Sequence, residues 1–433
     1  MMGENVGICI KGQRKKTTEF DSSFIKEQDI YCVSMEQAPN AIGSPCVKVG
    51  DYVSEGTMIA RPNNRNGVFV YSPVSGKVSQ IIQKLSISGQ LVDHVVIVPD
   101  KKNKVATLPR PDEINRKTLL ERLMISGIVD DDGNADYIKY VRMPGAKTNL
   151  IISCVDNDPY ISSNGITMKE NLEKVYEGIK YYLIILGGDK ATLLFTSKQT
   201  KLIKKVKQFI KVKNLKKELV VKITNDVYPL SNSEIVYSVT GRVLGESGRV
   251  SKGIYVESCV TAKLFAEAVD GKMPVSRLMT INGSGFVRQG NFEVKIGTSL
   301  KSIQEHIGAT DKNSQYKMIA GGVMTGIAQE SNDVSVGLGL NGVVFLTDNE
   351  FSEEKESPCI HCGKCVDVCP VRIMPYKVDE YLADNDLDFA VKFGLECCTG
   401  CGNCSYICPA KRYLTQRLVL AKNKYKKMRG GQR

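Results

Sequence analysis

Two copies of one cysteine pattern near the carboxyl end constrain this chain more than any other feature. They run Cys359-x2-Cys362-x2-Cys365-x3-Cys369 and Cys398-x2-Cys401-x2-Cys404-x3-Cys408, with a proline after each. They hold eight of the chain's 14 cysteines. A two-residue gap in a tight loop lets three thiolates face one centre, whereas the fourth cysteine is carried away by the chain. Each copy therefore needs the other to complete a set of four.

This spacing is that of bacterial ferredoxin domains with two [4Fe–4S] clusters, in which the fourth cysteine of each run ligates the other cluster. We therefore predict two ligand sets, which are Cys359, Cys362, Cys365 and Cys408 for the first cluster, and Cys398, Cys401, Cys404 and Cys369 for the second. Nearby valines, isoleucines and prolines are expected to form an apolar shell that limits the access of water. Cys397 is off register and is interpreted as a spare thiol.

Zinc sites and disulfides are the alternatives for such a set of cysteines. Zinc sites usually use pairs of Cys-x2-Cys units separated by a longer loop, not an unbroken run of four with a trailing proline. Disulfides need an oxidising compartment, and the first ten residues show no basic region followed by an apolar run, as a signal peptide would. The pattern favours iron–sulfur clusters in a reducing cytoplasm.

Composition limits the partners. The 433 residues are 42% hydrophobic and 7% aromatic, and no stretch approaches 18 apolar residues without a charge, so no membrane span is expected. The net charge of +12 has local sources: ten lysines between Lys198 and Lys222, and nine basic residues without an acidic one from Lys411 to Arg433. Such segments are usually solvated, or they dock an acidic partner or an anionic membrane surface. No motif indicates nucleic-acid binding.

Residues 42–82 predict a small barrel or sandwich, because valine-rich strands alternate with glycine-containing turns. The words Val47-Lys48-Val49-Gly50-Asp51 and Ser72-Pro73-Val74-Ser75-Gly76 resemble the lipoyl or biotinyl barrel-sandwich hybrid. Carrier domains of that kind have a lysine at the hairpin, but residues 62–67 contain none. This module is therefore expected to be unmodified and structural.

The middle of the chain alternates apolar runs with helical patterns, as in a parallel sheet covered by helices. Strands are expected at 150–155, 192–196, 219–223, 254–257 and 278–281, and helices at 109–124, 168–186, 198–212 and 262–269. From about residue 277 to 346, two strands, a helix at 299–306 and glycine-rich turns give a small β-grasp pattern.

The expected fold is therefore multidomain, α/β plus β. Its predicted divisions are an N-terminal segment (1–35), a barrel-sandwich hybrid (36–105), a Rossmann-like parallel α/β core (106–275), a β-grasp (SLBB-like) module (276–350), a ferredoxin domain with two [4Fe–4S] clusters (351–415) and a basic tail (416–433).

This order of modules resembles the RnfC family, the C subunits of the Rnf electron-transport complex, which are relatives of the flavin-bearing subunit of respiratory complex I. The resemblance covers nearly all of the chain from about residue 35. Besides Val47–Asp51, it is carried by the Ile128 region and by the words at 158–161, 237–242, 296–298, 321–329, 358–363 and 404–412. It implies electron transfer, with FMN and NADH as the family's further ligands.

One loop departs from the family pattern. The family has glycine after its Gly-Ile-Val word, where backbone must approach phosphate and flavin closely. Here Gly127-Ile128-Val129 is followed by Asp130-Asp131-Asp132-Gly133-Asn134-Ala135-Asp136, and the family's Glu-Cys-Glu-Pro-Tyr appears as Asp156-Asn157-Asp158-Pro159-Tyr160. These carboxylates would repel phosphates, so the flavin and NADH site is predicted to be degenerate. The alternative is a solvated acidic turn, which equally fails to bind a dinucleotide.

A family variant with this loop altered resembles the electron-transfer protein associated with D-proline reductase in amino-acid-fermenting clostridia. The resemblance implies a cytoplasmic electron-transfer protein that serves a reductase, D-proline reductase for this variant. The alternative is the NADH-oxidising, FMN-bearing RnfC protein of a membrane-bound Rnf complex, peripheral to the inner face of the membrane. No hydrolytic Ser-His-Asp or Cys-His set is evident. His361 is expected to hydrogen-bond to cluster sulfur or solvent, and Cys46 is interpreted as an inert thiol or a redox-active one.

Overall fold

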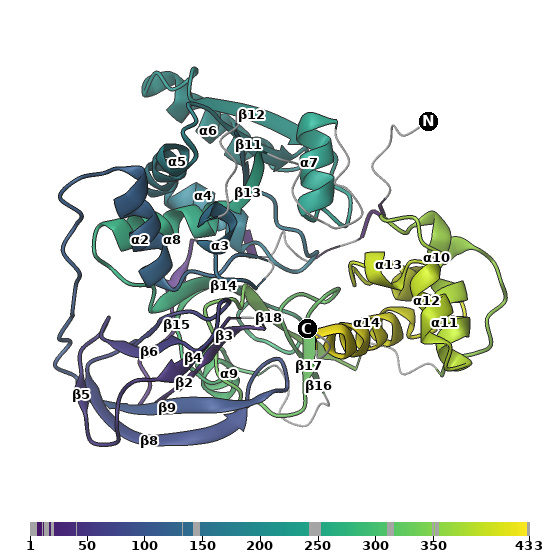
Figure 1. Ribbon diagram of the computed structural model, residues 1–433, viewed down its shortest axis with the longest axis horizontal. Coiled ribbons are helices and arrows are strands. Elements are labelled where there is room, and N and C mark those ends of the chain that lie inside the picture. Colours follow the sequence, from purple (N-terminus) through teal and green to yellow (C-terminus); the bar gives the residue numbers. More distant parts are fainter. Residues whose placement is uncertain are drawn as a thin grey trace.

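The computed structural model describes residues 7–10, 12, 17–18, 21–39, 41–131, 133–141, 148–241, 253–309, 316–348, 350 and 355–430. Asp132 of the acidic loop, Arg242 and residues 351–354 at the start of the predicted ferredoxin domain lie outside these ranges. The described strands form four sheets, and the mostly helical C-terminal part lies to one side of them (Figure 1). No helix among the described residues is both long and apolar enough to cross a membrane.

The barrel-sandwich hybrid consists of two four-stranded sheets with the orders β2-β9-β8-β5 and β3-β4-β6-β7. Their strands are β2 (Tyr31–Ser34), β3 (Glu36–Ala38), β4 (Ala41–Pro45), β5 (Tyr52–Val53), β6 (Met58–Pro62), β7 (Val70–Tyr71), β8 (Gly76–Leu85) and β9 (Leu91–Pro99). Val33, Val78 and Val95 are fully buried, as period-2 alternation predicts for strands with one face on a core. This confirms the predicted barrel-sandwich hybrid.

The α/β core contains one four-stranded parallel sheet with the order β12-β11-β10-β13. Its strands are β10 (Asn149–Ser153), β11 (Ala191–Thr196), β12 (Leu219–Thr224) and β13 (Ile254–Ser258). Its helices are α2 (Arg116–Ser126), α3 (Ile138–Val141), α4 (Ser163–Glu170), α5 (Leu172–Leu186), α6 (Thr200–Val212), α7 (Asn232–Thr240) and α8 (Cys259–Val269). Leu150 and Ile152 pack on the side of α5, α6 and α8, whereas Ile151 packs on the side of α7.

The order of these strands positions the site. From β10 the chain proceeds to β11 on one side, and β13 pairs with β10 on the other. Sheets of this kind bind ligands outside the carboxyl ends of the strands, at the point where the order reverses. In this sheet the order reverses between the neighbouring strands β10 and β13.

The region predicted as a β-grasp module contains most of a mixed six-stranded sheet with the order β1-β15-β14-β18-β16-β17. Its elements are β1 (Ser23–Phe24), β14 (Ser276–Asn282), β15 (Gly290–Lys295), α9 (Leu300–Ile307), β16 (Tyr316–Ala320), β17 (Ile327–Gln329) and β18 (Gly342–Thr347). The edge strand β1 comes from the N-terminal segment and pairs with β15, which the sequence did not indicate. The glycine-rich stretch expected to consist of turns also contains β16, β17 and β18.

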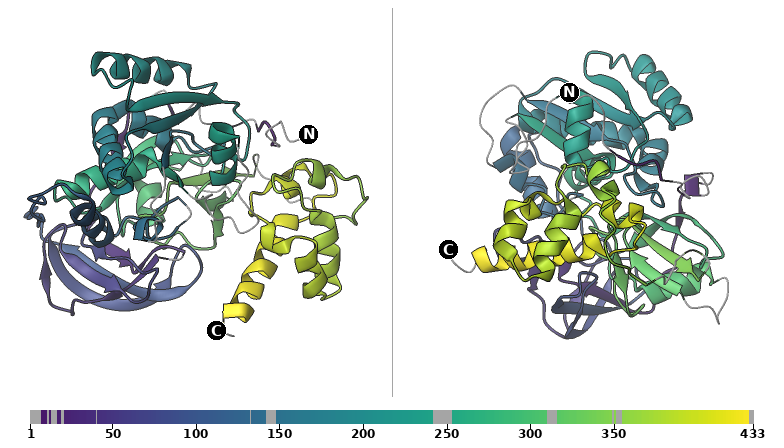
Figure 2. Two further views of the ribbon diagram at one scale, coloured as in Figure 1. Left: turned by 45° about the horizontal axis from the view of Figure 1, so that its top comes forward. Right: turned by 90° about the vertical axis from the view of Figure 1, so that its right-hand side faces the viewer.

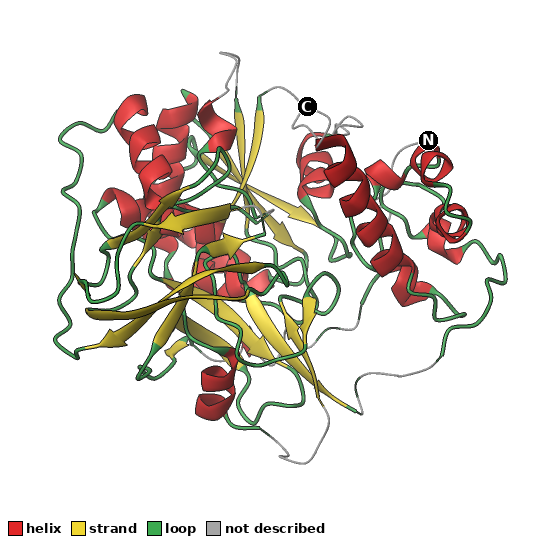
Figure 3. Ribbon diagram, turned by 60° about the horizontal axis from the view of Figure 1, so that its bottom comes forward, coloured by secondary structure: helices red, strands yellow, loops and turns green. Residues whose placement is uncertain are grey.

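The C-terminal part is helical (Figure 3). Its elements are α10 (Lys364–Asp367), α11 (Pro375–Ala383), α12 (Leu387–Lys392), the 3-10 helix η1 (Leu395–Cys397), α13 (Asn403–Ile407) and α14 (Leu414–Gly430). The predicted basic tail is therefore mostly helix. Leu414 and Leu418 are buried, whereas the far end of α14 projects from the body (Figure 2).

Close packing of α5 against α8 gives a test of the core. A Cβ on Gly178 of α5 would lie 1.9 Å from the carbonyl oxygen of Ala262 in α8. We expect Gly178→Ala to force the helices apart and to lower the free energy of unfolding by about 1–3 kcal/mol. Lys204→Ala on the exposed face of α6 is the control and should change little. Equal denaturation midpoints for the two variants would show that this contact is not tight.

Candidate functional site

Two small cavities in the C-terminal part are each lined by four cysteines. One is lined by Cys359, Cys362, Cys365 and Cys408, and the other by Cys369, Cys398, Cys401 and Cys404. Both sets combine three cysteines of one motif with the fourth of the other, so the structure brings together the residues of each predicted set. Cys397 lies in η1, is exposed and lines neither cavity.

The local backbone explains this arrangement. The short helices α10 and α13 follow Gly363 and Gly402, which have φ angles of 74° and 89°, so each loop reverses direction where a side chain would be strained. The third cysteine of each motif then lies on the first turn of its helix, buried where α10 packs against α13. Burial raises the pKa of Cys369 to about 11 and that of Cys404 to about 12.

The cavities suit a cluster better than a single ion. No group of three or more histidine, cysteine, aspartate or glutamate side chains in the described ranges is arranged to hold one metal ion. A zinc site would bring four ligands to about 2.0–2.3 Å from one centre, whereas each iron of a [4Fe–4S] cluster takes one thiolate. Apolar residues such as Val371, Ile373 and Leu418 complete the second cavity, which agrees with the predicted shell.

His361 lines the first cavity. Its side chain is 63% exposed, and its Nδ1 lies 3.6 Å from a carboxylate oxygen of Glu380. The neighbouring Ile360 is 65% exposed and Cys362 is also exposed. The loop of the first cavity is therefore open to solvent.

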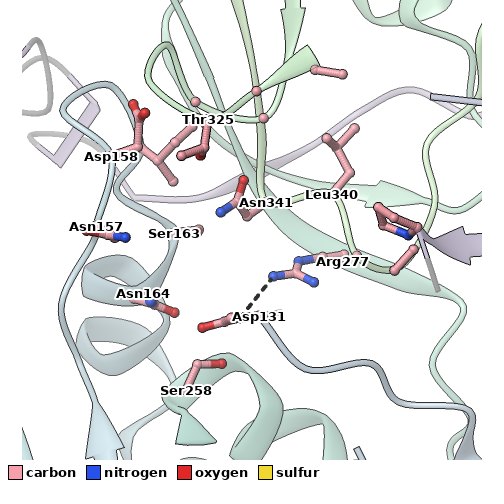
Figure 4. Close-up of a pocket in the computed structure, with 18 of the residues that line it drawn as sticks. Asp131, Asn157, Asp158, Ser163, Asn164, Ser258, Arg277, Thr325, Leu340 and Asn341 are labelled. Atoms are coloured by element: carbon pink, nitrogen blue, oxygen red, sulfur yellow. Dashed lines mark ion pairs between the residues drawn. The ribbon is translucent and has the colours of Figure 1, made fainter. Parts of the chain in front are cut away.

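A third cavity of about 330 Å³ lies where the α/β core, the barrel and the six-stranded sheet meet (Figure 4). Its walls include Ser153 at the end of β10 and Ser258 at the end of β13, which is the strand-order reversal described above. Arg277 from β14 and the turn at 320–327 close it from the opposite side. We call this cavity the sheet-edge pocket.

Asp131 of the acidic loop lines this pocket with its side chain 48% exposed, whereas two other aspartates of the loop are buried. Asp130 is 5% exposed and Asp136 is fully buried. The ammonium group of Lys139 lies 3.1 Å from each of these carboxylates and 3.0 Å from Glu257. Tyr140 donates a hydrogen bond to Glu257, and its ring stacks on Tyr182. Asp130 and Asp136 thus belong to a buried ion cluster with Lys139 and Glu257. The sequence did not reveal this cluster, because Glu257 is over 100 residues away.

Burial opposes the charge on Lys139, but Glu257, Asp136 and Asp130 together raise its pKa well above the ordinary value. Burial and the charge of Asp136 raise the pKa of Glu257, and Lys139 opposes this rise. The single ammonium of Lys139 is thus the cation shared by three carboxylates.

Two groups of backbone N–H donors that could attract an anion are also occupied by carboxylates of the chain. Asp156 accepts hydrogen bonds from the backbone N–H groups of Asn164 and Gly165 in the first turn of α4, at 2.8 and 3.1 Å. Asp158 accepts from the backbone N–H of Met324 at 3.0 Å, and a Cβ on Gly322 would lie 2.0 Å from its carboxyl carbon. Helix N-termini and close glycine backbone are where phosphates usually bind.

These residues do not fit the phosphate of a flavin nucleotide. The charged side chains in the pocket wall are the acids Glu36, Asp131, Asp156, Asp158 and Glu257 and the bases Lys139 and Arg277. The carboxylates thus outnumber the cations, and Lys139 is already shared among three of them. The position of the pocket matches a nucleotide site, whereas its charge opposes a phosphate.

The second cysteine cavity shares a wall with the sheet-edge pocket. Tyr228 is 4% exposed, lines the pocket and donates a hydrogen bond through its hydroxyl to the carbonyl oxygen of Cys401. Its own carbonyl oxygen accepts from the side chain of Asn403 at 3.4 Å. Met324 approaches Gly402 so closely that a Cβ there would lie 2.8 Å from its carbonyl oxygen. The loop of Cys401–Asn403 is therefore fixed to the pocket wall.

The Lys139 cluster predicts a pH-dependent defect. Lys139→Met leaves Asp130, Asp136 and Glu257 buried without a cation, so we expect a loss of roughly 3–5 kcal/mol of stability near neutral pH. Without Lys139 the pKa of Glu257 rises further above its ordinary value of 4.5. A carboxyl whose folded-state pKa is raised loses stability as pH rises above its unfolded pKa.

The deficit relative to the parent should therefore be larger at pH 8 than at pH 5.5, which urea denaturation at the two pH values measures. Lys201→Met, on the exposed face of α6, is the control. A deficit that is independent of pH would contradict the assignment of the buried carboxylates.

Three protein families match the chain in order. The RnfC barrel sandwich hybrid domain matches residues 4–102, the Nuo51 FMN-binding domain matches residues 126–263, and the 4Fe-4S dicluster domain matches residues 358–411. The NAD+-reducing [NiFe]-hydrogenase in its H2-reduced state has a TM-score of 0.48 and 11% identity, covering 75% of this chain and 67% of that one.

Curated relatives are similar along most of the chain. The C subunit of the Na(+)-translocating ferredoxin:NAD(+) oxidoreductase complex of Acetobacterium woodii is 28% identical, covering 88% of both chains. The C subunit of the ion-translocating oxidoreductase complex of Rhodobacter capsulatus is 29% identical, covering 90% of this chain and 76% of that one. The C subunit of the proton-translocating ferredoxin:NAD(+) oxidoreductase complex of Clostridium ljungdahlii is 29% identical, covering 85% and 82%. The chain is thus similar to RnfC proteins over most of its length, and its cysteine-rich part matches a 4Fe-4S dicluster domain.

Proposed function

We propose that the chain is the electron-transfer RnfC protein of an Rnf-type complex. The observation that carries the proposal is the pair of four-cysteine cavities, one fixed to the wall of the sheet-edge pocket and the other open to solvent. Its partners are then the other subunits of that complex, and its place is peripheral, on the cytoplasmic side of the membrane.

In this proposal the ligand sets are those that the spacing predicts. Cys359, Cys362, Cys365 and Cys408 hold the first cluster, and Cys398, Cys401, Cys404 and Cys369 hold the second. A bound [4Fe–4S] cluster supplies one-electron chemistry at a potential set by its hydrogen bonds and exposure. The chain's apolar residues exclude water from the second cavity, and Tyr228 and Asn403 hold its loop in place.

The open loop of the first cavity provides a surface for a partner. Ile360 and Cys362 are exposed there, and Lys364 and Lys411 lie on the flanking segments. An apolar centre with basic residues at its rim favours an acidic partner. Arg412 and Arg417, in contrast, are paired with Asp379 within the same domain, so only part of the basic C-terminal segment is available for docking.

The relatives support a subunit of an ion-translocating complex more than a soluble relay for D-proline reductase, since the three described above are named as C subunits of such complexes. The match to the FMN-binding domain supports a flavin at the sheet-edge pocket, whereas the carboxylates in its wall oppose the flavin phosphate. Electron transfer between the two clusters does not require a flavin in the sheet-edge pocket.

Cysteine variants test the two sets. Anaerobically purified protein should contain about eight iron atoms per chain. Cys362→Ala should disturb the first cluster alone and Cys401→Ala the second alone, as seen in the low-temperature paramagnetic spectrum after reduction. Cys397→Ala is the matched control and should leave iron content and spectrum unchanged. If Cys397→Ala lost iron while Cys401→Ala kept it, the ligand assignment would be wrong.

Tyr228→Phe tests the shared wall. Loss of the hydrogen bond to the Cys401 carbonyl should change the reduction potential and spectrum of the second cluster and leave those of the first unaltered, because Tyr228 bonds to the Cys401–Asn403 loop and does not line the first cavity. Tyr176→Phe, whose hydroxyl bonds to Glu218 far from both cavities, is the control. Equal shifts of both clusters in Tyr228→Phe would argue against this contact as the local determinant.

A further inference from the structure

The sheet-edge pocket contains one cationic group that the chain leaves incompletely paired. Arg277 is 5% exposed, and one terminal nitrogen of its guanidinium donates to the carbonyl oxygen of Leu338. The other terminal nitrogen lies 3.9 Å from Asp131, which is too long for a hydrogen bond. The Nε group has no hydrogen-bond partner among the described residues. A buried guanidinium in this state has donors to spare for an anion.

A second unpaired polar atom lies at the same cavity. Glu257 Oε2 is buried without a partner in the described part of the chain, and Glu257 lines the pocket. In Figure 4, Asn341, Asn164 and Ser258 surround the space between Arg277 and Asp131. Buried polar groups are normally satisfied, so unsatisfied ones gathered at a single cavity indicate a polar ligand.

Charge and size then restrict the ligand. Asp156 and Asp158 occupy the backbone N–H groups suited to a phosphate, and Lys139 is held by three carboxylates. Among the charged side chains described in the pocket wall, Arg277 has unused donors, and a guanidinium suits one carboxylate in a fork-like pair. A volume of about 330 Å³ is at the lower end of the range for small-molecule pockets.

From this geometry we propose that the sheet-edge pocket binds a small organic monocarboxylate, a hydroxy or amino acid, held by Arg277, in place of a phosphorylated flavin. The proposal rests on the function proposed above, because it assigns a ligand to the pocket beside the second cluster. The carboxylate pairs with the guanidinium of Arg277. The ligand's hydroxyl or ammonium group donates to Asp131, which faces Arg277 across the space.

Calorimetry on the anaerobic holoprotein tests this, with L-lactate, L-alanine, inorganic phosphate and FMN as probes. We expect saturable binding of lactate or alanine and none of phosphate or FMN. Arg277→Gln should weaken carboxylate binding at least tenfold and Arg277→Lys should weaken it less, because lysine keeps the charge but not the fork. Arg288→Gln, at an exposed arginine outside the pocket, is the control.

A second variant keeps the test decisive if Arg277→Gln does not fold. Asp156→Ser removes the carboxylate from the first turn of α4 and should allow phosphate or FMN to bind. Stoichiometric FMN in the parent protein, or carboxylate binding that Arg277→Gln leaves unchanged, would overturn the proposal. Iron content and the reduced spectrum of the same samples report on the clusters, so failure of the ligand assignment is distinguishable from failure of the electron-transfer function.

Discussion

The contact between the loop of Cys401–Asn403 and Tyr228 is the interaction on which the functional arrangement depends. It joins a helical cysteine-rich part to an α/β core more than 150 residues earlier in the chain. With it, one cavity lies against the pocket at the carboxyl edge of the sheet, and the other faces outward. The two cavities therefore lead from the sheet-edge pocket to the solvent-exposed loop of Ile360 and Cys362.

The sheet-edge pocket combines the position of a nucleotide site with a wall in which carboxylates outnumber cations. The cavity lies at the carboxyl ends of β10 and β13, where the strand order reverses and where α/β folds bind nucleotides. Its charged groups, however, are satisfied mainly by one another. The ammonium group of Lys139 is paired with Asp130, Asp136 and Glu257. The carboxylate of Asp156 accepts a hydrogen bond from a backbone N–H in the first turn of α4. A buried cluster of this kind costs desolvation energy, and it persists only because each carboxylate has a cation or hydrogen-bond donor nearby.

Much of this could be predicted from the sequence. The spacing of the cysteines predicted which four residues share each cavity, because the geometry is local to two loops. Valine alternation and helical periodicity predicted the barrel and the parallel sheet. The burial of Asp130 and Asp136 could not be predicted, because it depends on Glu257 on a distant strand. Likewise β1 pairs with β15 across more than 250 residues, and nothing in the Ser23–Phe24 segment indicates that partner. Arg277 carried no sequence signal, since an isolated arginine in a strand usually faces solvent.

Electron transfer by this chain requires two clusters held crosswise by cysteines of both motifs. Low-temperature electron paramagnetic resonance of the anaerobic protein, reduced with dithionite, tests this requirement most directly. We expect two reduced [4Fe–4S] centres whose signals broaden each other because they lie in one small domain. A spectrum with no iron–sulfur signal, from protein that also lacks acid-labile sulfide, would contradict it.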